Sequence, residues 1–345
     1  MASIKQKEFF SIAAAWVAWR ANPVQGRPLA LGYCGRSWTQ LGFQAWAIPV
    51  PLAEQARCPY LLLSESRAPT RTPPIPPAGL LSGIRRSRMA ANFWTSSHSK
   101  QLLDPEDVDV VPAQDRERGV TPVEFRLVKI HMSFHIWRLA QQVKVRQRVI
   151  ATAITYFRRV YTRKSMTEYD PRLVAPACLY LASKVEESTV QARLLVFYIK
   201  KMCGSDDKYR FEIKDILEME MKLLEALDYY LVVYHPYRPL LQLLQDAGIT
   251  DLTQFAWGLV NDTYKMDLIL IYPPYMIALA CIYIASVLKD KDTTSWFEEL
   301  RVDMNIVKNI SMEILDFYDT YKIDPQRGLQ EDKIIPVMNK LPSKA

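Results

Sequence analysis

The side chains that could support catalysis or bind a metal are few, and their spacing matches no known reaction centre. His131 and His135 stand four residues apart, as on a metal-binding helix, but the segment H-M-S-F-H lacks the adjacent glutamate and a third ligand. The glycines beyond residue 88 are isolated, so they form no phosphate-binding loop, and no G-x-S-x-G nucleophile elbow occurs. The five cysteines include no C-x-x-C pair, so no zinc ribbon or disulfide framework is indicated. We therefore predict no catalytic residue, no metal and no cofactor.

One lysine stands where an apolar segment ends. Lys184 follows P-R-L-V-A-P-A-C-L-Y-L-A-S, and a lysine that leaves a buried helix must reach solvent, a carboxylate or a carbonyl group of a partner. The candidate carboxylate is Glu220, in L-E-M-E-M-K-L-L-E-A-L. A structural ion pair within the chain and a binding site for a partner both remain open.

A cluster of basic residues is the other concentrated charge feature. Arg148, Arg159 and Arg163 are expected to share the polar face of one amphipathic helix with Thr152 and Thr155, while Ile150, Ala153, Ile154, Phe157 and Tyr161 form its apolar face. Such a face is usually a solvated one, and its functional alternative is a docking surface for an acidic or phosphorylated partner.

The elements that position these side chains are predicted to be helices. Thr121-Pro122-Val123-Glu124 combines a hydroxyl N-cap, a proline at the first helical position and a glutamate at the third, which predicts a helix from 122 to about 141. Further helices are expected around 150–161, from 171, after 188 and over 213–228, and no segment of this part shows the alternation of a strand.

The helical part contains an internal repeat. A shift of 103 residues places P-R-L-V-A-P-A-C-L-Y-L-A-S, which starts at Pro171, over P-Y-M-I-A-L-A-C-I-Y-I-A-S, which starts at Pro274, with seven of 13 positions identical. Both segments are apolar nearly all round, which predicts a helix that is buried on every side. Pro273-Pro274 interrupts the uncharged run 268–288 and leaves about 15 helical residues, too few to cross a bilayer.

The net charge of +7 is unevenly distributed along the 345 residues. Residues 1–88 carry 11 Lys and Arg against three Glu and no Asp, whereas residues 89–345 carry 33 basic and 34 acidic residues. The basic character that could indicate nucleic acid binding thus belongs to the first 88 residues, which are rich in Pro and Trp and show no sustained apolar period. We expect this extension to be disordered or mispredicted, ahead of an internal start at Met89.

Several motifs together resemble a known family. L-A-S-K-V-E-E (181–187), followed by M-E-M-K-L-L-E-A-L (219–227), resembles the cyclin box. M-A-A-N-F-W-T-S-S-H (89–98), R-Q-R-V-I-A-T-A (146–153), V-Y-H-P-Y-R-P-L-L-Q (233–242) and V-N-D-T-Y (260–264) are similar to the C-type transcriptional cyclins of the Mediator kinase module. The resemblance covers 89 to about 340.

This resemblance implies an all-α fold of two tandem five-helix cyclin-box repeats. The expected division is an extension over 1–88, a kinase-contacting helix and linker over 89–120, repeats over 121–232 and 233–322, and a tail over 323–345. It also implies a nuclear, non-enzymatic subunit that activates a cyclin-dependent kinase and so regulates transcription by RNA polymerase II. The implied partners are that kinase and Mediator subunits 12 and 13, with no membrane and no direct contact to nucleic acid.

The resemblance also implies which residues bind these partners. Lys184 and Glu220 match the cyclin pair that hydrogen-bonds the kinase backbone near its αC helix, Glu187 would pair with a basic residue there, and Phe93 and Trp94 would contact the kinase from the N-terminal helix. On the second repeat, Trp257, Asn261 and Asp262 match a groove for Mediator subunit 12, although Trp257 could equally belong to the core.

Two sequence features bear on other functions that proteins with this fold perform. The first helix carries V-E-F-R-L-V-K-I-H in place of the M-R-A-I-L substrate-docking patch of cell-cycle cyclins, so substrate recruitment by that patch is not predicted. The alternative function is that of a promoter-binding protein like initiation factor B, which shares the double fold. The paired C-x-x-C of that family's zinc ribbon is missing, and residues 89–345 are not basic.

Overall fold

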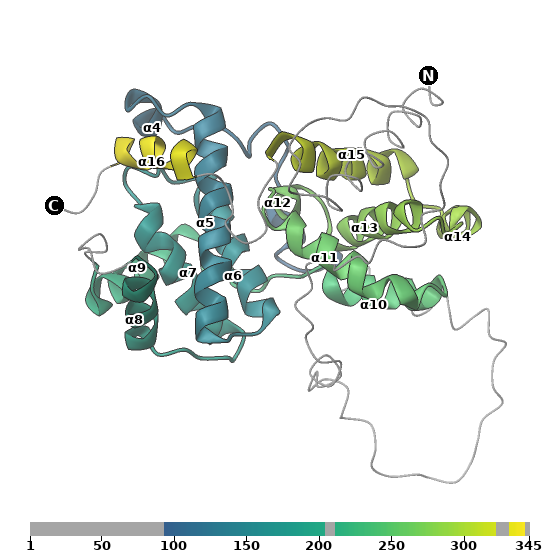
Figure 1. Ribbon diagram of the computed structural model, residues 1–345, viewed down its shortest axis with the longest axis horizontal. Coiled ribbons are helices and arrows are strands. Elements are labelled where there is room, and N and C mark those ends of the chain that lie inside the picture. Colours follow the sequence, from purple (N-terminus) through teal and green to yellow (C-terminus); the bar gives the residue numbers. More distant parts are fainter. Residues whose placement is uncertain (1–92, 204–210, 322–330, 342–345) are drawn as a thin grey trace, which may run out of the picture.

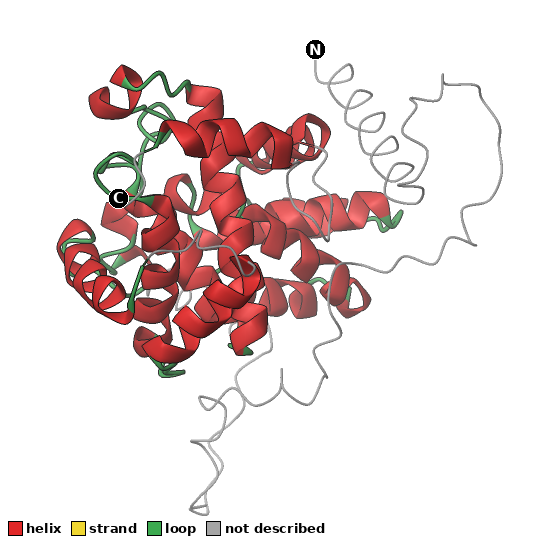
Figure 2. Ribbon diagram, turned by 60° about the vertical axis from the view of Figure 1, so that its left-hand side comes forward, coloured by secondary structure: helices red, strands yellow, loops and turns green. Residues whose placement is uncertain are grey.

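The computed structural model describes residues 93–203, 211–321 and 331–341, and all regular structure in these ranges is helical. Figure 1 shows two groups of helices side by side, and Figure 2 shows helices and loops but no strand in the described part. The predicted all-α class is therefore confirmed. The prediction that residues 1–88 are disordered or mispredicted lies outside the described residues.

Each group is one repeat of five main helices. The first contains α5 (Pro122–Val143), α6 (Gln147–Val160), α7 (Pro171–Val185), α8 (Ala192–Cys203) and α9 (Ile213–Ala226). The second contains α10 (Tyr237–Asp246), α11 (Thr253–Thr263), α13 (Pro274–Leu288), α14 (Thr294–Leu300) and α15 (Met304–Tyr321). The shorter elements are η2 (Ser99–Gln101), α4 (Ala113–Glu117), η3 (Thr250–Leu252), α12 (Leu268–Ile271) and α16 (Glu331–Lys340).

The internal repeat is visible in the central helix of each group. α7 and α13 begin and end 103 residues apart, and both are buried at most of their positions because the other helices of the repeat surround them. Small residues such as Cys178 and Cys281, both fully buried, allow this close packing. In the described residues no helix is both long and apolar enough to span a membrane.

The start of α5 follows from its local sequence. The Thr121 side chain accepts a hydrogen bond from the backbone N–H of Glu124, and the Glu124 carboxylate accepts one from the backbone N–H of Thr121. This capping box and the proline at the first helical position satisfy backbone groups that a helix end leaves free. The predicted helix is confirmed and continues two residues further, to Val143.

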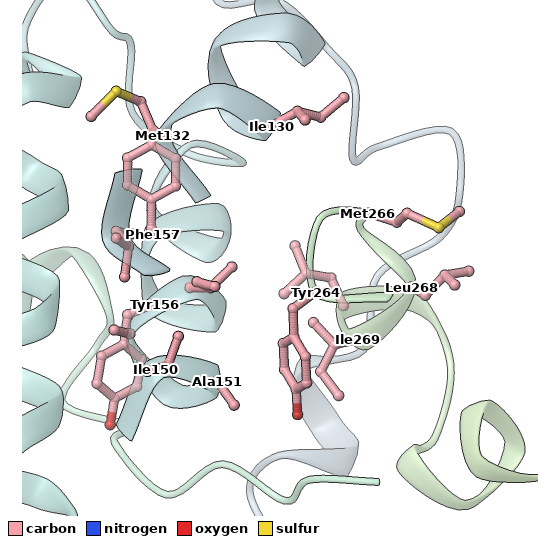
Figure 3. Close-up of a cluster of buried hydrophobic side chains, with 14 of the residues drawn as sticks. Ile130, Met132, Ile150, Ala151, Tyr156, Phe157, Tyr264, Met266, Leu268 and Ile269 are labelled. Carbon is pink, nitrogen blue, oxygen red and sulfur yellow. The ribbon is translucent and has the colours of Figure 1, made fainter. Parts of the chain in front are cut away.

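The prediction that α6 has one polar face toward solvent is wrong. Every residue from 149 to 160 is buried, including Thr152, Thr155 and Arg159. α6 packs against α5 and α7. Of its predicted polar face, Thr152 meets His235 of the linker and Glu186 at the end of α7, and Arg159 meets Gln101 in the segment before α5. Figure 3 shows buried side chains of α6, such as Ile150, opposite Tyr264 and Ile269 of the second repeat.

An ionic cluster joins the two repeats at this contact. Arg158 of α6 donates to the Asp267 carboxylate (2.8 Å) and to the backbone oxygen of Tyr264 (2.9 Å). Lys129 of α5 donates to the other Asp267 oxygen (2.9 Å) and to Asp109 (3.0 Å). Both cationic side chains are 1% exposed. Although burial alone would raise the pKa of Asp267, the charges of Arg158 and Lys129 lower it.

The C-terminal helix returns from the second repeat to the first. α16 lies beside α5 (Figure 1), where Lys340 binds the Glu124 carboxylate (2.7 Å) and the backbone oxygen of Gly119 (2.9 Å). Ile334 and Val337 of α16 are buried in this contact. The α16 helix therefore covers part of the first helix of the first repeat.

Candidate functional site

The structure brings Lys184 and Glu220 together at the surface of the first repeat. The Lys184 ammonium group, near the end of α7, lies 2.8 and 2.9 Å from the two carboxylate oxygens of Glu220 on α9, and 4.2 Å from the centre of the Tyr180 ring. Burial lowers the pKa of Lys184, but Glu220 and Tyr180 raise it by more, so the lysine is a cation at neutral pH. The ion pair that the sequence left open is thus present. Lys184 remains 43% exposed, whereas the Glu220 side chain is 9% exposed.

The turn after α7 exposes a second carboxylate. Glu187 lies in the left-handed region with φ of 51°, its backbone N–H donates to the Lys184 oxygen (3.1 Å), and the residue is exposed. Glu186, the residue before it, points inward and has 10% of its side chain exposed. The turn therefore separates the two glutamates, and Glu187 faces solvent three residues after Lys184.

Exposed apolar side chains lie on α9, which carries Glu220, and on the neighbouring helix α8. Leu217 and Met221 on α9 are 41% and 60% exposed, and Phe197 on α8 is 59% exposed. Leu217 and Met221 are four residues apart and share one side of α9, and Leu217 stands three residues before Glu220, so this side borders the Lys184–Glu220 pair. No sequence pattern had singled out these residues, although large apolar residues around a lysine-paired glutamate could have indicated them. We define the apolar surface as Phe197, Leu217 and Met221, which Leu194 and Ile213 extend.

Phe93 and Trp94, the first described residues, have different environments. Phe93 is 5% exposed and packs edge-on against Tyr234 and His98, with ring centroids 5.9 and 5.5 Å apart. Trp94 is 51% exposed and its ring lies 6.5 Å from that of Tyr275. Phe93 is thus held within the chain, and only Trp94 presents a large free surface. The preceding part of the predicted N-terminal helix lies outside the described residues.

Trp257 and Asn261 form a partly exposed pair on α11. The Trp257 ring stacks on Tyr237 with centroids 4.5 Å apart, and the Asn261 side-chain oxygen accepts hydrogen bonds from the Tyr237 hydroxyl (2.9 Å) and from Gln147 (3.1 Å). Both residues are half-buried, and the Trp257 side chain packs against the hydrophobic core. Trp257 thus packs against the core, and a groove at this position stays a prediction.

Asp262 points to another side of α11. It is 9% exposed, and its carboxylate accepts hydrogen bonds from the Tyr318 hydroxyl (2.6 Å) and from Lys265 (2.8 Å). Tyr318 belongs to α15, so Asp262 connects α11 to α15 beside the Trp257 and Asn261 pair. Binding of a Mediator subunit by these three residues stays a prediction.

The three arginines do not form one exposed face. Arg159 is 5% exposed, so it is not available to a partner at the surface. Arg148 and Arg163 are exposed but pair with carboxylates of the chain, Glu186 at 2.7 Å and Asp228 respectively. The reason is that α6 is a central helix, whose arginines bridge to neighbouring segments. Docking of an acidic partner therefore stays a prediction for Arg148 and Arg163 alone.

Groups of reactive type elsewhere are enclosed. Burial raises the pKa of the Cys178 and Cys281 thiols, so neither is a thiolate at neutral pH. Burial and the neighbouring His131 lower the pKa of His135 to about 4. Within the described ranges no three His, Cys, Asp or Glu side chains are placed to hold a metal ion.

Known proteins share much of the sequence of this chain. A family model described as "Cyclin, N-terminal domain" matches residues 90–232. Cyclin-C1-1 of Oryza sativa subsp. japonica is 92% identical over 257 residues, which cover 74% of this chain and 100% of that protein. Cyclin-C1-2 of Arabidopsis thaliana is 64% identical over 255 residues (73% and 98%), and Cyclin-C of Rattus norvegicus is 42% identical over 263 residues (74% and 91%).

Solved structures share the fold at low sequence identity. A chain of the CAK complex from Chaetomium thermophilum bound to ATP-gamma-S superposes with a TM-score of 0.58 at 18% identity, covering 73% of this chain and 88% of that one. A chain of the yeast RNA Pol II CTD kinase CTDK-1 complex gives 0.55 at 18% identity, covering 71% and 86%. At this identity the likeness concerns the fold alone.

Proposed function

Because this chain belongs to the cyclin family, as a C-type cyclin, and is thus a regulatory subunit and not itself an enzyme, we propose that it binds and activates a transcriptional cyclin-dependent kinase of the Mediator kinase module. The structural neighbours support a kinase partner, since their titles name the CAK complex and the CTD kinase CTDK-1. The chain would regulate transcription by RNA polymerase II in the nucleus.

The observation that carries this proposal is the Lys184–Glu220 pair, with its partly exposed lysine, beside the apolar surface. Exposed apolar side chains on adjacent helices favour association with another protein, because burying them removes apolar area from water. A half-exposed lysine held in place by a carboxylate adds a fixed donor, which can bind a backbone carbonyl of the partner without first losing its side-chain freedom. Together they form an apolar centre with an oriented polar rim, the usual composition of a specific interface.

The proposed mechanism is allosteric. Lys184 and Glu220 would bind the kinase backbone around its αC helix, and Glu187 would pair with a basic residue on that helix. Fixing αC allows the kinase to form the lysine–glutamate ion pair on which phosphoryl transfer depends. The chemistry then belongs to the kinase, and this chain changes the population of its active conformation.

A second contact is proposed on the other repeat. Trp257 and Asn261 lie half-buried on α11, with the Trp257 ring stacked on Tyr237 and Asp262 beside them. A partly exposed aromatic ring that is already held by stacking loses little entropy on binding, which suits it as an interface anchor. We assign this surface to Mediator subunit 12, through which the chain would also be linked to subunit 13.

The kinase proposal is tested by removing the ion pair as a unit. Lys184→Ala combined with Glu220→Ala leaves no unpaired buried charge, so the fold is kept while the oriented donor is lost. We expect the affinity for the co-purified kinase to fall about thirtyfold, as for an interface hot spot. A matched control is Lys214→Ala with Glu218→Ala, which removes an exposed ion pair from the same helix α9. Unchanged kinase binding by the first variant, with circular dichroism still helical, would refute the proposed site.

A further inference from the structure

Four segments that are far apart in the sequence meet in one chain of hydrogen bonds between the repeats. The Tyr264 hydroxyl, after α11, lies 2.6 Å from Nδ1 of His235 in the linker between the repeats. Nε2 of His235 lies 2.8 Å from Oγ1 of Thr152 on α6, and Oγ1 of Thr152 lies 2.7 Å from Oε1 of Glu186 at the end of α7. The hydrogen bonds therefore connect the second repeat, through the linker, to the turn that carries Glu187.

When His235 is neutral, the donors and acceptors in this series of hydrogen bonds fix the direction of each bond. Glu186 can only accept, so the Thr152 hydroxyl donates to it and must accept from His235. Nε2 of His235 therefore carries the proton, and Nδ1 accepts from the Tyr264 hydroxyl. Enclosure of the ring, together with the charge of Arg148, lowers the pKa of His235 to about 3, so this neutral form is the one present at pH 7.

One end of this series of hydrogen bonds is Glu186, which sets the geometry of the turn after α7. Glu186 is the C-cap of α7, and its backbone N–H donates to the Ala182 oxygen (2.9 Å). Its second carboxylate oxygen lies 2.7 Å from Nε of Arg148, so both oxygens are held. Lys184 precedes Glu186 by two residues and Glu187 follows it directly, which means that rotation of this residue would move both.

The other end of this series of hydrogen bonds, Tyr264, belongs to the core of the second repeat. Tyr264 is 2% exposed and stacks on Tyr237, with centroids 6.0 Å apart. Tyr237 begins α10 and also binds Asn261, so Tyr264 cannot move without disturbing the packing of that repeat. Because protein interiors are close-packed, an anchor of this kind fixes the position of whatever is bonded to it.

We propose that this chain of hydrogen bonds makes the second repeat part of the kinase-binding site, with Glu186, Thr152 and His235 as positioning residues that hold Lys184 and Glu187 in their binding geometry. The inference rests on the proposed function. Its physical basis is that each member of this series of hydrogen bonds is held by its neighbours, so the loss of one hydroxyl frees one oxygen of the Glu186 carboxylate and leaves it held only by the exposed Arg148. A released Glu186 leaves the turn free to adopt several conformations, and the kinase then binds only a fraction of them.

The experiment removes one hydroxyl and measures kinase affinity in two backgrounds. Thr152→Val keeps the shape of the buried side chain but breaks both of its hydrogen bonds, and His235→Phe breaks the chain at the linker. We expect each variant to weaken kinase binding about tenfold, from the loss of one or two hydrogen bonds. The double variant should bind the kinase no more weakly than either single variant, because both substitutions interrupt the same series of hydrogen bonds. Thr152→Ser, which retains the hydroxyl, should bind like the unmodified protein and thereby shows that the effect is not one of packing.

The second background distinguishes positioning from general destabilisation. When Lys184→Ala and Glu187→Ala are already present, Thr152→Val should have no further effect on affinity, since it acts through those two side chains. Asp267→Asn serves as control, because it weakens another inter-repeat contact that does not lead to α7. The inference is overturned if Thr152→Val binds normally, if it weakens binding equally in both backgrounds, or if Asp267→Asn or Thr152→Ser causes the same loss. If Lys184→Ala with Glu187→Ala binds the kinase normally, the proposed site itself is wrong and the inference falls with it.

Discussion

Removal of the Asp267 carboxylate should strongly destabilise the contact between the repeats. Asp267 accepts from Arg158 at 2.8 Å and from Lys129 at 2.9 Å, and both cations are almost fully buried. At an effective dielectric constant of about 20, each pair attracts by about 6 kcal/mol before the cost of desolvation is subtracted. Loss of one partner from such a buried cluster typically costs about 3–5 kcal/mol, since it leaves a charge unpaired.

The remaining contacts place the expected loss at the lower end of that range. Lys129 keeps Asp109 at 3.0 Å, and Arg158 keeps the backbone oxygen of Tyr264 at 2.9 Å. We therefore expect Asp267→Ala to lower the free energy of unfolding by about 3 kcal/mol and Asp267→Asn, which retains an acceptor, by about 2 kcal/mol.

Urea unfolding followed by circular dichroism measures both values. With a slope of about 3 kcal/mol per molar urea, the midpoint of Asp267→Ala should fall by about 1 M. Lys129→Met is an informative partner, because a methionine of similar length leaves no unpaired cation on α5 and should reduce the effect of the Asp267 substitution. A loss below about 1 kcal/mol for Asp267→Ala, or full additivity of the two substitutions, would refute the view that this cluster fastens the repeats together.

Three further predictions concern the cap of α5, a buried histidine and the buried thiols. Thr121→Ala should cost about 1 kcal/mol in urea unfolding through the lost N-cap, and should cost less when Glu124→Ala has already opened the capping box. Burial and the charge of Arg159 lower the pKa of His98 to about 3 in the folded state, so the unfolded chain binds more protons below pH 6.5. His98 should contribute about 2 kcal/mol to the stability lost between pH 7 and pH 5, and a His98→Gln variant that loses as much stability over this range as the unmodified protein would contradict this. Cys178 and Cys281 should react with a thiol reagent only after denaturation, and rapid labelling of the native protein, read by peptide mass spectrometry, would contradict their burial.

Local sequence signals determined most of the helix positions. The capping box at Thr121 placed the start of α5, because caps are formed by residues that are neighbours in the chain. The shift of 103 residues gave α7 and α13 the same bounds, since both copies satisfy the same packing problem. Part of the candidate site was also readable, because a lysine that leaves an apolar helix requires a partner, and Glu220 supplies it.

Helix periodicity failed where one repeat packs on the other. The polar face of α6 looked solvated because Thr152 and Arg159 alternate with apolar residues in the expected way, yet both are buried. A periodic pattern reports which side of a helix is more polar, but it does not show whether distant parts of the chain satisfy that side with hydrogen bonds. For α6 those partners include Gln101 and Glu186, which approach it only in the folded chain.

The sequence by itself thus determined the helices, the duplication and the residues of the Lys184–Glu220 pair, because short-range caps, apolar periods and the burial of charge act on local segments. Only the tertiary structure decided how these residues are held. Arg158 reaches Asp267 across 109 residues, and Thr152 meets His235 across 83, to form contacts for which no local pattern exists. Buried polar groups take whichever partner the folded chain brings within about 3 Å, so their pairing follows from topology and not from sequence spacing.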